Sequence, residues 1–253
     1  MMVQNQSYKT YQESRMMTAS VCDLTGQWRP SAIMEVMQEM AGAHSQVLGV
    51  GRNALLEQGM VWIITQAEVE MDFYPRFYDT VQIETFPMPV RRWFFPRYFR
   101  FRDAAGNEIG RAGTMWVLLD LNSRKMAPPN TVLHLLPDNS DLPAPLGLPS
   151  PITEIGGTVQ TSIHEAVYTD LDLNGHVNNT RYIDWACNAL GTDTLRTSCL
   201  KRFSIQFHHE VLPGQVVNTE LHRFLDDFTF GGKDGDGKRF FDIGGKLMDR
   251  VVR

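Results

Sequence analysis

The sequence predicts an α+β protein made of two copies of one unit, each combining a long helix with an antiparallel sheet. Three observations support this fold class. The chain contains a weak internal repeat, and each copy holds one segment with apolar residues at helical spacing. Segments rich in aromatic and β-branched residues follow each helical segment, as expected for strands.

A proline-rich segment separates the two copies. Seven of the 13 prolines lie between Pro128 and Pro151, which indicates an irregular, partly extended connection. A chain of 253 residues is long enough for two domains with separate cores. We therefore expect an N-terminal domain over 1–127, a linker over 128–151 and a C-terminal domain over 152–253.

The repeat is visible in two aligned stretches. DLTGQWRPSAIMEVMQEMAG, residues 23–42, aligns with DLNGHVNNTRYIDWACNALG, residues 172–191, at an offset of 149 without a gap. VEMDFYPRFYDTVQIE, residues 69–84, aligns with IQFHHEVLPGQVVNTE, residues 205–220, at an offset of 136. Few residues are identical, but the order of elements is the same in both copies.

Each copy is expected to run as strand, turn, one helix and then several strands. The apolar spacing predicts helices over about 31–48 and 180–190, and Asn178 is the expected N-cap of the second helix. The strand candidates are VWIITQAEVEM, TVQIETF, FFPRYFRFRD, RAGTMWVLLDL, FSIQFHHEV and QVVNTELHRF. GGKDGDGK, residues 231–238, lacks the ligand spacing of a calcium loop and is predicted to be a hairpin end.

The two copies differ in residues that can carry chemistry. The second copy has Asn174, His176 and Glu210, and their counterparts in the first copy are Thr25, Gln27 and Tyr74. Chemistry needed once per chain would be kept in one copy only, so these three residues are candidate catalytic groups. A locally hydrogen-bonded histidine and a solvated glutamate remain alternatives for His176 and Glu210.

Asp172 differs from those three because the first copy has Asp23 at the same place. An Asp before a Gly turn often binds nearby backbone N–H groups. A structural role and a catalytic role therefore both stay open for Asp172. Cys187 falls within a helical pattern and is interpreted as a small buried apolar residue, with a nucleophile as the alternative.

At these residues the sequence resembles the acyl-acyl carrier protein (acyl-ACP) thioesterases of the bacterial kind. DLDLNGHVNNTRYIDW, residues 170–185, reproduces the family pattern Asp-x-Asn-x-His-Val-Asn-Asn-x-x-Tyr, and IQFHHEV, residues 205–211, resembles the family segment Ile-Glu-Tyr-Arg-Arg-Glu-Cys. The resemblance implies a tandem (double) hotdog, with two antiparallel sheets each wrapped around one long helix. It also implies hydrolysis of fatty acyl-ACP, which releases free fatty acid and ends elongation.

The resemblance assigns catalytic positions to Asp172, Asn174, His176 and Glu210. Glu210 would activate water as general base, with direct attack to form an anhydride as the alternative. Asn174 would position the water or the thioester carbonyl, His176 would bind the reacting groups and protonate the leaving thiolate, and Asp172 would orient the loop. Backbone N–H groups of Gly175, His176 and Val177, near a helix N-terminus, would stabilise the oxyanion.

Two departures from the family pattern affect these assignments. Val211 stands where plant members carry a Cys, so a thiol mechanism is not possible there. His208 and His209 replace two basic residues, which would change how the carrier protein or its phosphopantetheine is held.

Substrate contacts are expected in the first half of the chain. Met34, Met37 and Met40, on adjacent turns of the first helix, are candidates for an acyl pocket, with plain core packing as the alternative. VRRWFFPRYFRFR, residues 90–102, holds five arginines and no acid. Arg91 and Arg92 are therefore candidate contacts for the acidic carrier protein, with a solvated strand face as the alternative.

Composition narrows the range of partners, cofactors and cellular locations that we expect for this protein. The net charge of −5 gives no reason to expect nucleic acid as a partner, and no apolar run approaches the length of a membrane span. The first ten residues lack the apolar core of a signal peptide, so we expect a cytoplasmic protein. Three cysteines without close spacing argue against a disulfide framework or a zinc site, and we expect neither a cofactor nor a metal. A homodimer remains possible.

Three other functions are weighed against acyl-ACP hydrolysis. A hotdog hydratase or dehydratase typically has Asp-x-Asn-Pro-x-His, whereas Asp172 to His176 is one residue shorter and has no Pro. An acyl-CoA thioesterase of the hotdog superfamily is the main alternative. A non-catalytic acyl-binding module would need neither His176 nor Glu210.

Overall fold

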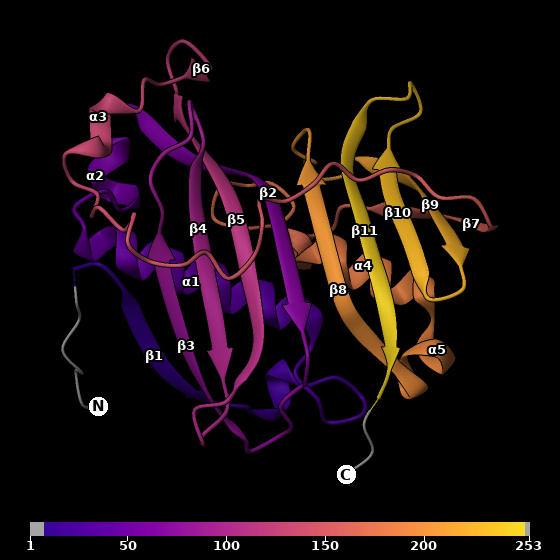
Figure 1. Ribbon diagram of the computed structural model, residues 1–253. Coiled ribbons are helices and arrows are strands. Elements are labelled where there is room, and N and C mark those ends of the chain that lie inside the picture. The colour runs from indigo at the N-terminus through magenta and orange to yellow at the C-terminus, as the bar shows by residue number, and fades with distance from the viewer. Residues whose placement is uncertain (1–7, 251–253) are drawn as a thin grey trace. The chain divides into compact units, whose positions relative to one another are not determined.

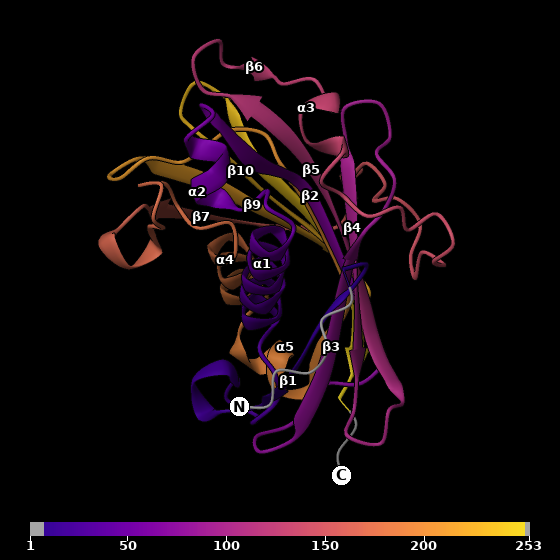
Figure 2. The same cartoon turned by 90° about the vertical axis from the view of Figure 1, so that its left-hand side faces the viewer.

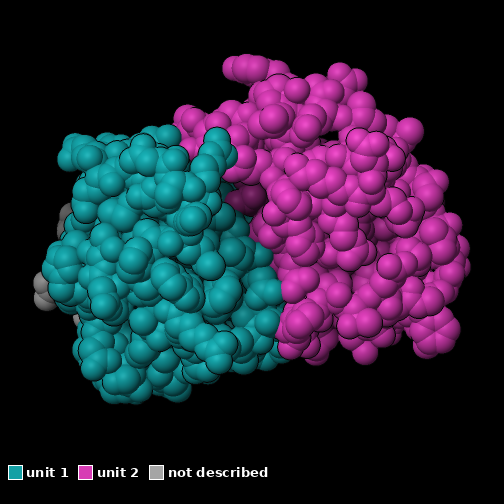
Figure 3. All heavy atoms as spheres, turned by 90° about the horizontal axis from the view of Figure 1, so that it is seen from above, with its two compact units in different colours: residues 1–28, 33–149 teal, residues 29–32, 150–253 magenta. Residues whose placement is uncertain are grey.

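The chain forms two compact units, shown in different colours in Figure 3. The computed structural model describes residues 8–250. Within that range the first unit holds residues up to 28 together with 33–149, and the second holds 29–32 together with residues from 150 onward. Residues 1–7, part of the segment on which the signal-peptide expectation rests, lie outside the described range.

The first unit is one antiparallel sheet with a long helix (Figures 1 and 2). Its strands are ordered β1-β3-β4-β5-β2, and the short β6 pairs with β5. Its elements are β1 (Tyr11–Met16), η1 (Ala19–Val21), α1 (Pro30–Val47), α2 (Arg52–Leu56), β2 (Met60–Met71), β3 (Thr80–Pro87), β4 (Phe95–Arg102), β5 (Glu108–Asp120), β6 (Lys125–Met126) and α3 (Asn130–Leu133).

Helix α1 matches the predicted first helix to within one residue at each end. Pro30 occupies its first position, where the missing N–H has no intrahelical partner to lose. Its apolar stripe is buried and includes all three candidate methionines, Met34, Met37 and Met40. His44 continues the stripe and stacks on Tyr11 of β1 with ring centroids 5.9 Å apart, so this face of α1 lies on the sheet.

The second unit repeats this plan with shorter helices (Figure 1). Its strands are ordered β8-β11-β10-β9-β7, and each pair of neighbours is antiparallel. Its elements are β7 (Thr158–Glu165), η2 (Tyr168–Asp170), α4 (Arg181–Leu190), α5 (Thr192–Thr197), β8 (Ser198–Phe207), β9 (Val216–Phe224), β10 (Asp227–Lys233) and β11 (Arg239–Asp249). The turn between β10 and β11 confirms the hairpin predicted from GGKDGDGK.

Helix α4 covers this sheet with aromatic side chains. Tyr182 stacks on Phe241 of β11 at 4.3 Å between centroids, and Trp185 stacks on His164 of β7 at 4.7 Å. Tyr182 and Trp185 are both almost fully buried. Aromatic burial of this kind supplies a large share of core stability, so it holds α4 firmly on its sheet.

Individual backbone hydrogen bonds of the first unit recur in the second unit at the offsets of the sequence repeat. The isolated bridge between Cys22 and Trp28 recurs between Leu171 and Val177, at the offset of 149. The bond from Met17 N to Asp79 O, 2.8 Å, recurs as Ala166 N to Gln215 O, 3.0 Å, with offsets of 149 and 136. Each unit is thus one antiparallel sheet wrapped on a long helix, and the predicted α+β double hotdog is confirmed.

The proline-rich segment is packed in its first half, up to Asn139. It contains α3, and Leu135 and Leu136 join an apolar cluster with Leu48 and Val50 of the first unit. The amide of Asn139 donates to the carbonyl oxygens of Lys9 and Pro87, at 2.9 and 2.8 Å. Among residues 8–250, no helix is long and apolar enough to span a bilayer.

Candidate active site

The opening turn of the predicted site is built by Asp172. Its Oδ1 accepts the backbone N–H of Asn174 at 2.8 Å and that of His176 at 3.4 Å, while its own N–H donates to the His176 carbonyl at 2.8 Å. Gly175 has φ +77°, a left-handed conformation that glycine adopts without strain. The carboxylate of Asp172 is therefore engaged in holding the turn.

Asp23 makes the same turn in the first unit. Its Oδ1 accepts the backbone N–H of Thr25 at 2.8 Å and of Gln27 at 3.2 Å, and its N–H donates to the Gln27 carbonyl at 2.8 Å. Gly26 also has φ +77°. This match favours the structural role of Asp172 over a direct catalytic one.

The side chains of His176 and Glu210 meet at the next step. His176 Nε2 lies 3.3 Å from Glu210 Oε2, with side-chain exposures of 29% and 54%. Glu210 follows the end of β8, and the backbone N–H of Val177 donates to the carbonyl of the adjacent Val211 at 2.9 Å. That bond joins the turn to the end of β8 and brings the imidazole and the carboxylate together within the second unit.

Asn174 is exposed on the same turn. Its Nδ2 lies 3.3 Å from Asp172 Oδ2, a long and weak hydrogen bond. The four residues predicted from the motif are thus linked in two contacts, Asp172 with Asn174 and His176 with Glu210.

Two predicted oxyanion donors are engaged elsewhere. The Gly175 N–H donates to the Asp172 carbonyl at 3.0 Å, and the Val177 N–H donates to Val211. A backbone N–H already inside a turn or a bridge is not directed at a reacting oxygen. The oxyanion role expected for Gly175 and Val177 stays a prediction, and in this structure both N–H groups have backbone partners within the fold of the turn.

The predicted helix cap is also displaced. Helix α4 begins at Arg181, with Thr180 as its N-cap and no side-chain cap bond. Asn178 lies two residues earlier, and its Oδ1 accepts the N–H and the hydroxyl of Thr180 at 3.0 and 3.1 Å. Asn178 thus makes the side-chain hydrogen bond expected of an N-cap, although the first helical residue is Arg181.

Tyr182 is a residue near the site that the sequence analysis did not single out. It is 2% exposed on the first turn of α4. Burial raises the pKa of its hydroxyl, the carboxylates of Asp172 and Glu210 raise it further, and a backbone hydrogen bond with Val211 opposes the increase. The sequence signal that could have identified Tyr182 is its position as the last residue, Tyr, of the family pattern.

The arginine-rich segment is divided between three environments. Arg97 is buried beside His44, and Arg100 and Arg102 approach Glu84 at 3.6 and 3.5 Å. Arg91 and Arg92 lie on an exposed turn between β3 and β4. The segment therefore does not present five arginines on one face, and two of them remain as candidate contacts.

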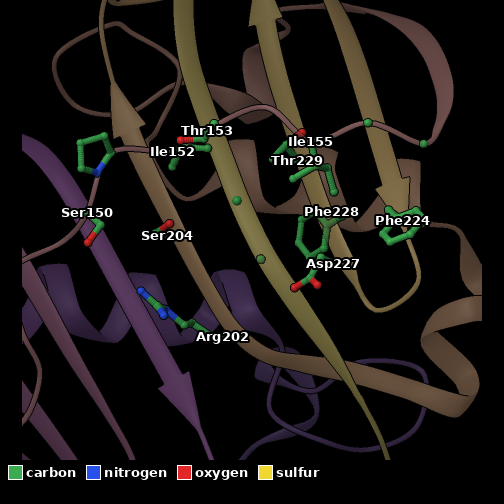
Figure 4. A pocket seen from close by; sticks show the side chains of 15 residues that line it. Ser150, Ile152, Thr153, Ile155, Arg202, Ser204, Phe224, Asp227, Phe228 and Thr229 are labelled. Carbon is green, nitrogen blue, oxygen red and sulfur yellow. The ribbon is translucent and has the colours of Figure 1, made fainter.

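Two pockets open on the sheet of the second unit, both against strands β10 and β11. The larger, about 630 Å³, lies between residues 150–157 and those strands, with Ile152, Ser204 and Thr229 in its lining (Figure 4). The smaller, about 420 Å³, adjoins it and shares Ile152 and Thr229. Neither is lined by His176, Glu210 or the three candidate methionines.

Comparison with known proteins places this geometry in a family. Residues 8–131 match the acyl-ACP thioesterase N-terminal domain, and residues 158–235 match the acyl-ACP thioesterase C-terminal domain. The chain belongs to the acyl-ACP thioesterase family. The second match contains both the turn from Asp172 and the Glu210 position.

Relatives within the family are similar at low identity. The chain is 25% identical over 214 residues to the chloroplastic oleoyl-acyl carrier protein thioesterase of Coriandrum sativum, covering 78% of this chain and 58% of that protein. It is 23% identical over 221 residues to the chloroplastic palmitoyl-acyl carrier protein thioesterase of Cuphea hookeriana, covering 82% and 51%. The chain thus spans little more than half the length of these two relatives.

Solved structures of this family share the fold. An acyl-ACP thioesterase from Bacteroides thetaiotaomicron superposes with a TM-score of 0.86 at 23% identity, covering 96% of this chain and all of that one. The 12:0-ACP thioesterase from Umbellularia californica gives 0.81 at 18% identity, covering 95% and 98%.

Proposed function

We propose that this protein hydrolyses the thioester of fatty acyl-ACP, releasing a free fatty acid and holo-ACP and ending chain elongation. The observation that carries the proposal is the contact between His176 and Glu210, on the family's motif positions and in the second unit only. In the first unit the counterparts are Gln27 and Tyr74, which cannot act as a base near neutral pH.

In the proposed reaction Glu210 removes one proton from a water molecule while the water oxygen bonds to the thioester carbon. General base catalysis of this kind contributes roughly 10²- to 10⁴-fold. Glu210 then passes the proton that it took from water to His176 Nε2, 3.3 Å away, and the sulfur takes that proton from Nε2 when the C–S bond breaks. One water is consumed, and one carboxylic acid and one thiol are formed.

The developing negative charge on the thioester oxygen needs donors other than the backbone of the turn. The Gly175 and Val177 N–H groups are engaged, so side-chain donors take this role in the proposal. Asn174 is proposed for this role because its side chain is exposed on the turn that carries His176.

The test of the base is an acyl-ACP panel of several chain lengths with wild type, Glu210→Gln and His176→Ala. Both variants should lose at least about 100-fold in kcat and keep the wild-type melting temperature. Glu165→Gln and His134→Ala are matched controls because both residues are exposed and lie outside the motif. Wild-type kcat in a folded Glu210→Gln protein would show that the base is another group.

A single turnover in ¹⁸O-labelled water separates the two possible roles of Glu210. Direct attack of water on the thioester places ¹⁸O in the first fatty acid released. If Glu210 forms an anhydride that opens at its own carboxyl, the first fatty acid is unlabelled. We expect the labelled product.

The carrier protein is proposed to dock at Arg91 and Arg92. Both lie on an exposed turn, and opposite charge steers the encounter with an acidic partner. The double variant Arg91→Glu/Arg92→Glu should raise KM for acyl-ACP several-fold at low salt. Acyl-CoA is the matched control, since it carries no protein partner. An unchanged KM for acyl-ACP would eliminate this docking site.

The remaining proposals concern the acyl chain, the location and the assembly. Met34, Met37 and Met40 are proposed to contact the acyl chain. Alanine at each should change the chain-length profile of kcat/KM more than the control Met88→Ala, which lies between β3 and β4.

A cytoplasmic location and a homodimer are proposed as well. Cell fractionation tests the location, and analytical ultracentrifugation tests the homodimer.

A further inference from the structure

The segment that carries Glu210 is hydrogen-bonded to strand β11. The backbone N–H groups of His208 and His209 both donate to the Phe240 carbonyl, at 2.8 and 3.2 Å. The His208 side chain adds a bond from Nε2 to Asp242 Oδ2 of 2.8 Å. Asp242 also lies 3.3 Å from Arg239, so one largely buried carboxylate binds two nitrogen donors beside Glu210.

The corresponding segment of the first unit is hydrogen-bonded at the same positions. The N–H groups of Asp72 and Phe73 donate to the Ile109 carbonyl, at 2.9 and 3.1 Å. The Asp72 carboxylate lies 3.2 Å from the Arg111 guanidinium, which also lies 3.1 Å from Glu108. Positions 72 and 208 correspond at the offset of 136, and positions 108, 109 and 111 correspond to 239, 240 and 242 at an offset of 131.

The two clusters have opposite polarity at these three matched positions. The first unit has a central cation, Arg111, with carboxylates at 72 and 108, and Arg111 also pairs with Glu70, whose counterpart in the second unit is the uncharged Gln206. The second unit has a central carboxylate, Asp242, with nitrogen donors at 208 and 239. Either polarity can join the two strands, so strand pairing alone does not explain the reversal.

The units also differ two positions further along the chain. In the first unit the residue there is Tyr74, which is buried and carries no charge at neutral pH. In the second unit it is Glu210. A carboxylate at position 208 would stand close to Glu210, and like charges disfavour ionisation of both. The reversed polarity puts a donor at 208 and moves the carboxylate onto β11.

We propose that the His208–Asp242 pair is a positioning device for Glu210, whose polarity keeps a second carboxylate away from the proposed base. The inference rests on the proposed function of Glu210, and His208 acts only through that residue. Among the ionisable groups, His176 contacts Glu210 and Tyr182 interacts with it electrostatically, while Asp172 acts on Tyr182. His209 adjoins Glu210 in the chain, and Arg239 contacts Asp242.

The test transfers the first unit's cluster to the second. The triple variant His208→Asp/Arg239→Glu/Asp242→Arg restores an ion-paired cluster with reversed polarity. We expect it to have a melting temperature near wild type and a kcat on acyl-ACP about tenfold lower. We also expect a change in the dependence of kcat/KM on pH. The pH below which kcat/KM falls, called here the acidic limb, should rise by on the order of one pH unit, because a nearby carboxylate raises the pKa of the base.

Two single variants complete the design. His208→Arg keeps a donor at this position and should retain the wild-type pH profile. His208→Asn removes the His208–Asp242 pair without adding a carboxylate, and it should lower the melting temperature without moving the acidic limb. If the triple variant does not fold, the single variant His208→Asp replaces it and should still move the limb upward.

The outcomes separate this inference from the proposed function. A triple variant with the wild-type pH profile and kcat would show that the polarity has no role, while Glu210→Gln in the same assay would still be inactive. If Glu210→Gln is active, the base assignment itself fails, whatever the triple variant does. A shifted profile in His208→Arg would also overturn the inference.

Discussion

The backbone N–H of Val177 donates to the carbonyl of Val211 over 2.9 Å, and the side chains of the residues just before them, His176 and Glu210, lie 3.3 Å apart. The first unit has the same bond from Trp28 to Pro75, also 2.9 Å. A common backbone scaffold therefore serves both units. At these positions the side chains placed on it distinguish the unit with the candidate site.

The shared turn predicts that Asp23 and Asp172 contribute similarly to stability. Replacing either by Ala removes a side-chain acceptor for two backbone N–H groups, which should lower the free energy of unfolding by about 1–2 kcal/mol. Urea denaturation of both variants measures the effect.

The asparagine variant at position 172 tests whether this aspartate also takes part in the reaction. Asp172→Asn keeps one oxygen acceptor, so we expect kcat to stay within about tenfold of wild type. A loss as large as that of Glu210→Gln, in a folded protein, would show that the Asp172 charge is catalytic.

The buried pair of His44 and Arg97 predicts a specific pH dependence of stability. His44 Nδ1 lies 3.1 Å from Arg97 Nη1, and burial, with the Arg97 charge, lowers the pKa of His44 to about 4. Below its ordinary value of 6.5 the unfolded chain takes up a proton before the folded one does. The contribution of His44 is thus complete above about pH 6.5 and is lost as the pH falls toward 4, by up to about 3 kcal/mol.

The measurement compares wild type with His44→Gln by urea denaturation at several pH values. The difference in unfolding free energy between the two proteins should change between about pH 6.5 and 4 and be constant above that range. His134→Gln, at an exposed histidine, is the control and should show no such change. Parallel curves for wild type and His44→Gln would contradict the prediction.

Gly214, at a turn position that the two units share, predicts an effect of backbone conformation on stability. Gly214 has φ +74° with no atom within 4 Å of the place that a Cβ would occupy, and its counterpart Tyr78 has φ +71°. Gly214→Ala should lower the free energy of unfolding by about 1 kcal/mol through backbone strain alone. Gly42→Ala, in α1 with equally open space, should raise it by a similar amount. Thermal melts of the two variants should move in opposite directions.

Much of the fold could be predicted because its signals are local. The apolar stripe of α1, the six strand segments and the turn of residues 231–238 are each encoded within about ten to twenty neighbouring residues. The short helices α2 and α5 were not predicted, since five or six residues carry too little periodicity.

The candidate site was predictable as a set of residues but not as an arrangement. The repeat, the position of the motif and the asymmetry that singles out His176 and Glu210 are all visible in the chain before it folds. Three further facts emerge only from the packed units: Asp172 is committed to its turn, the Gly175 and Val177 N–H groups are occupied, and Asp242 faces His208. Local patterns follow from steric and apolar preferences of neighbouring residues, whereas hydrogen-bond partners depend on which distant segments the packed sheets bring together.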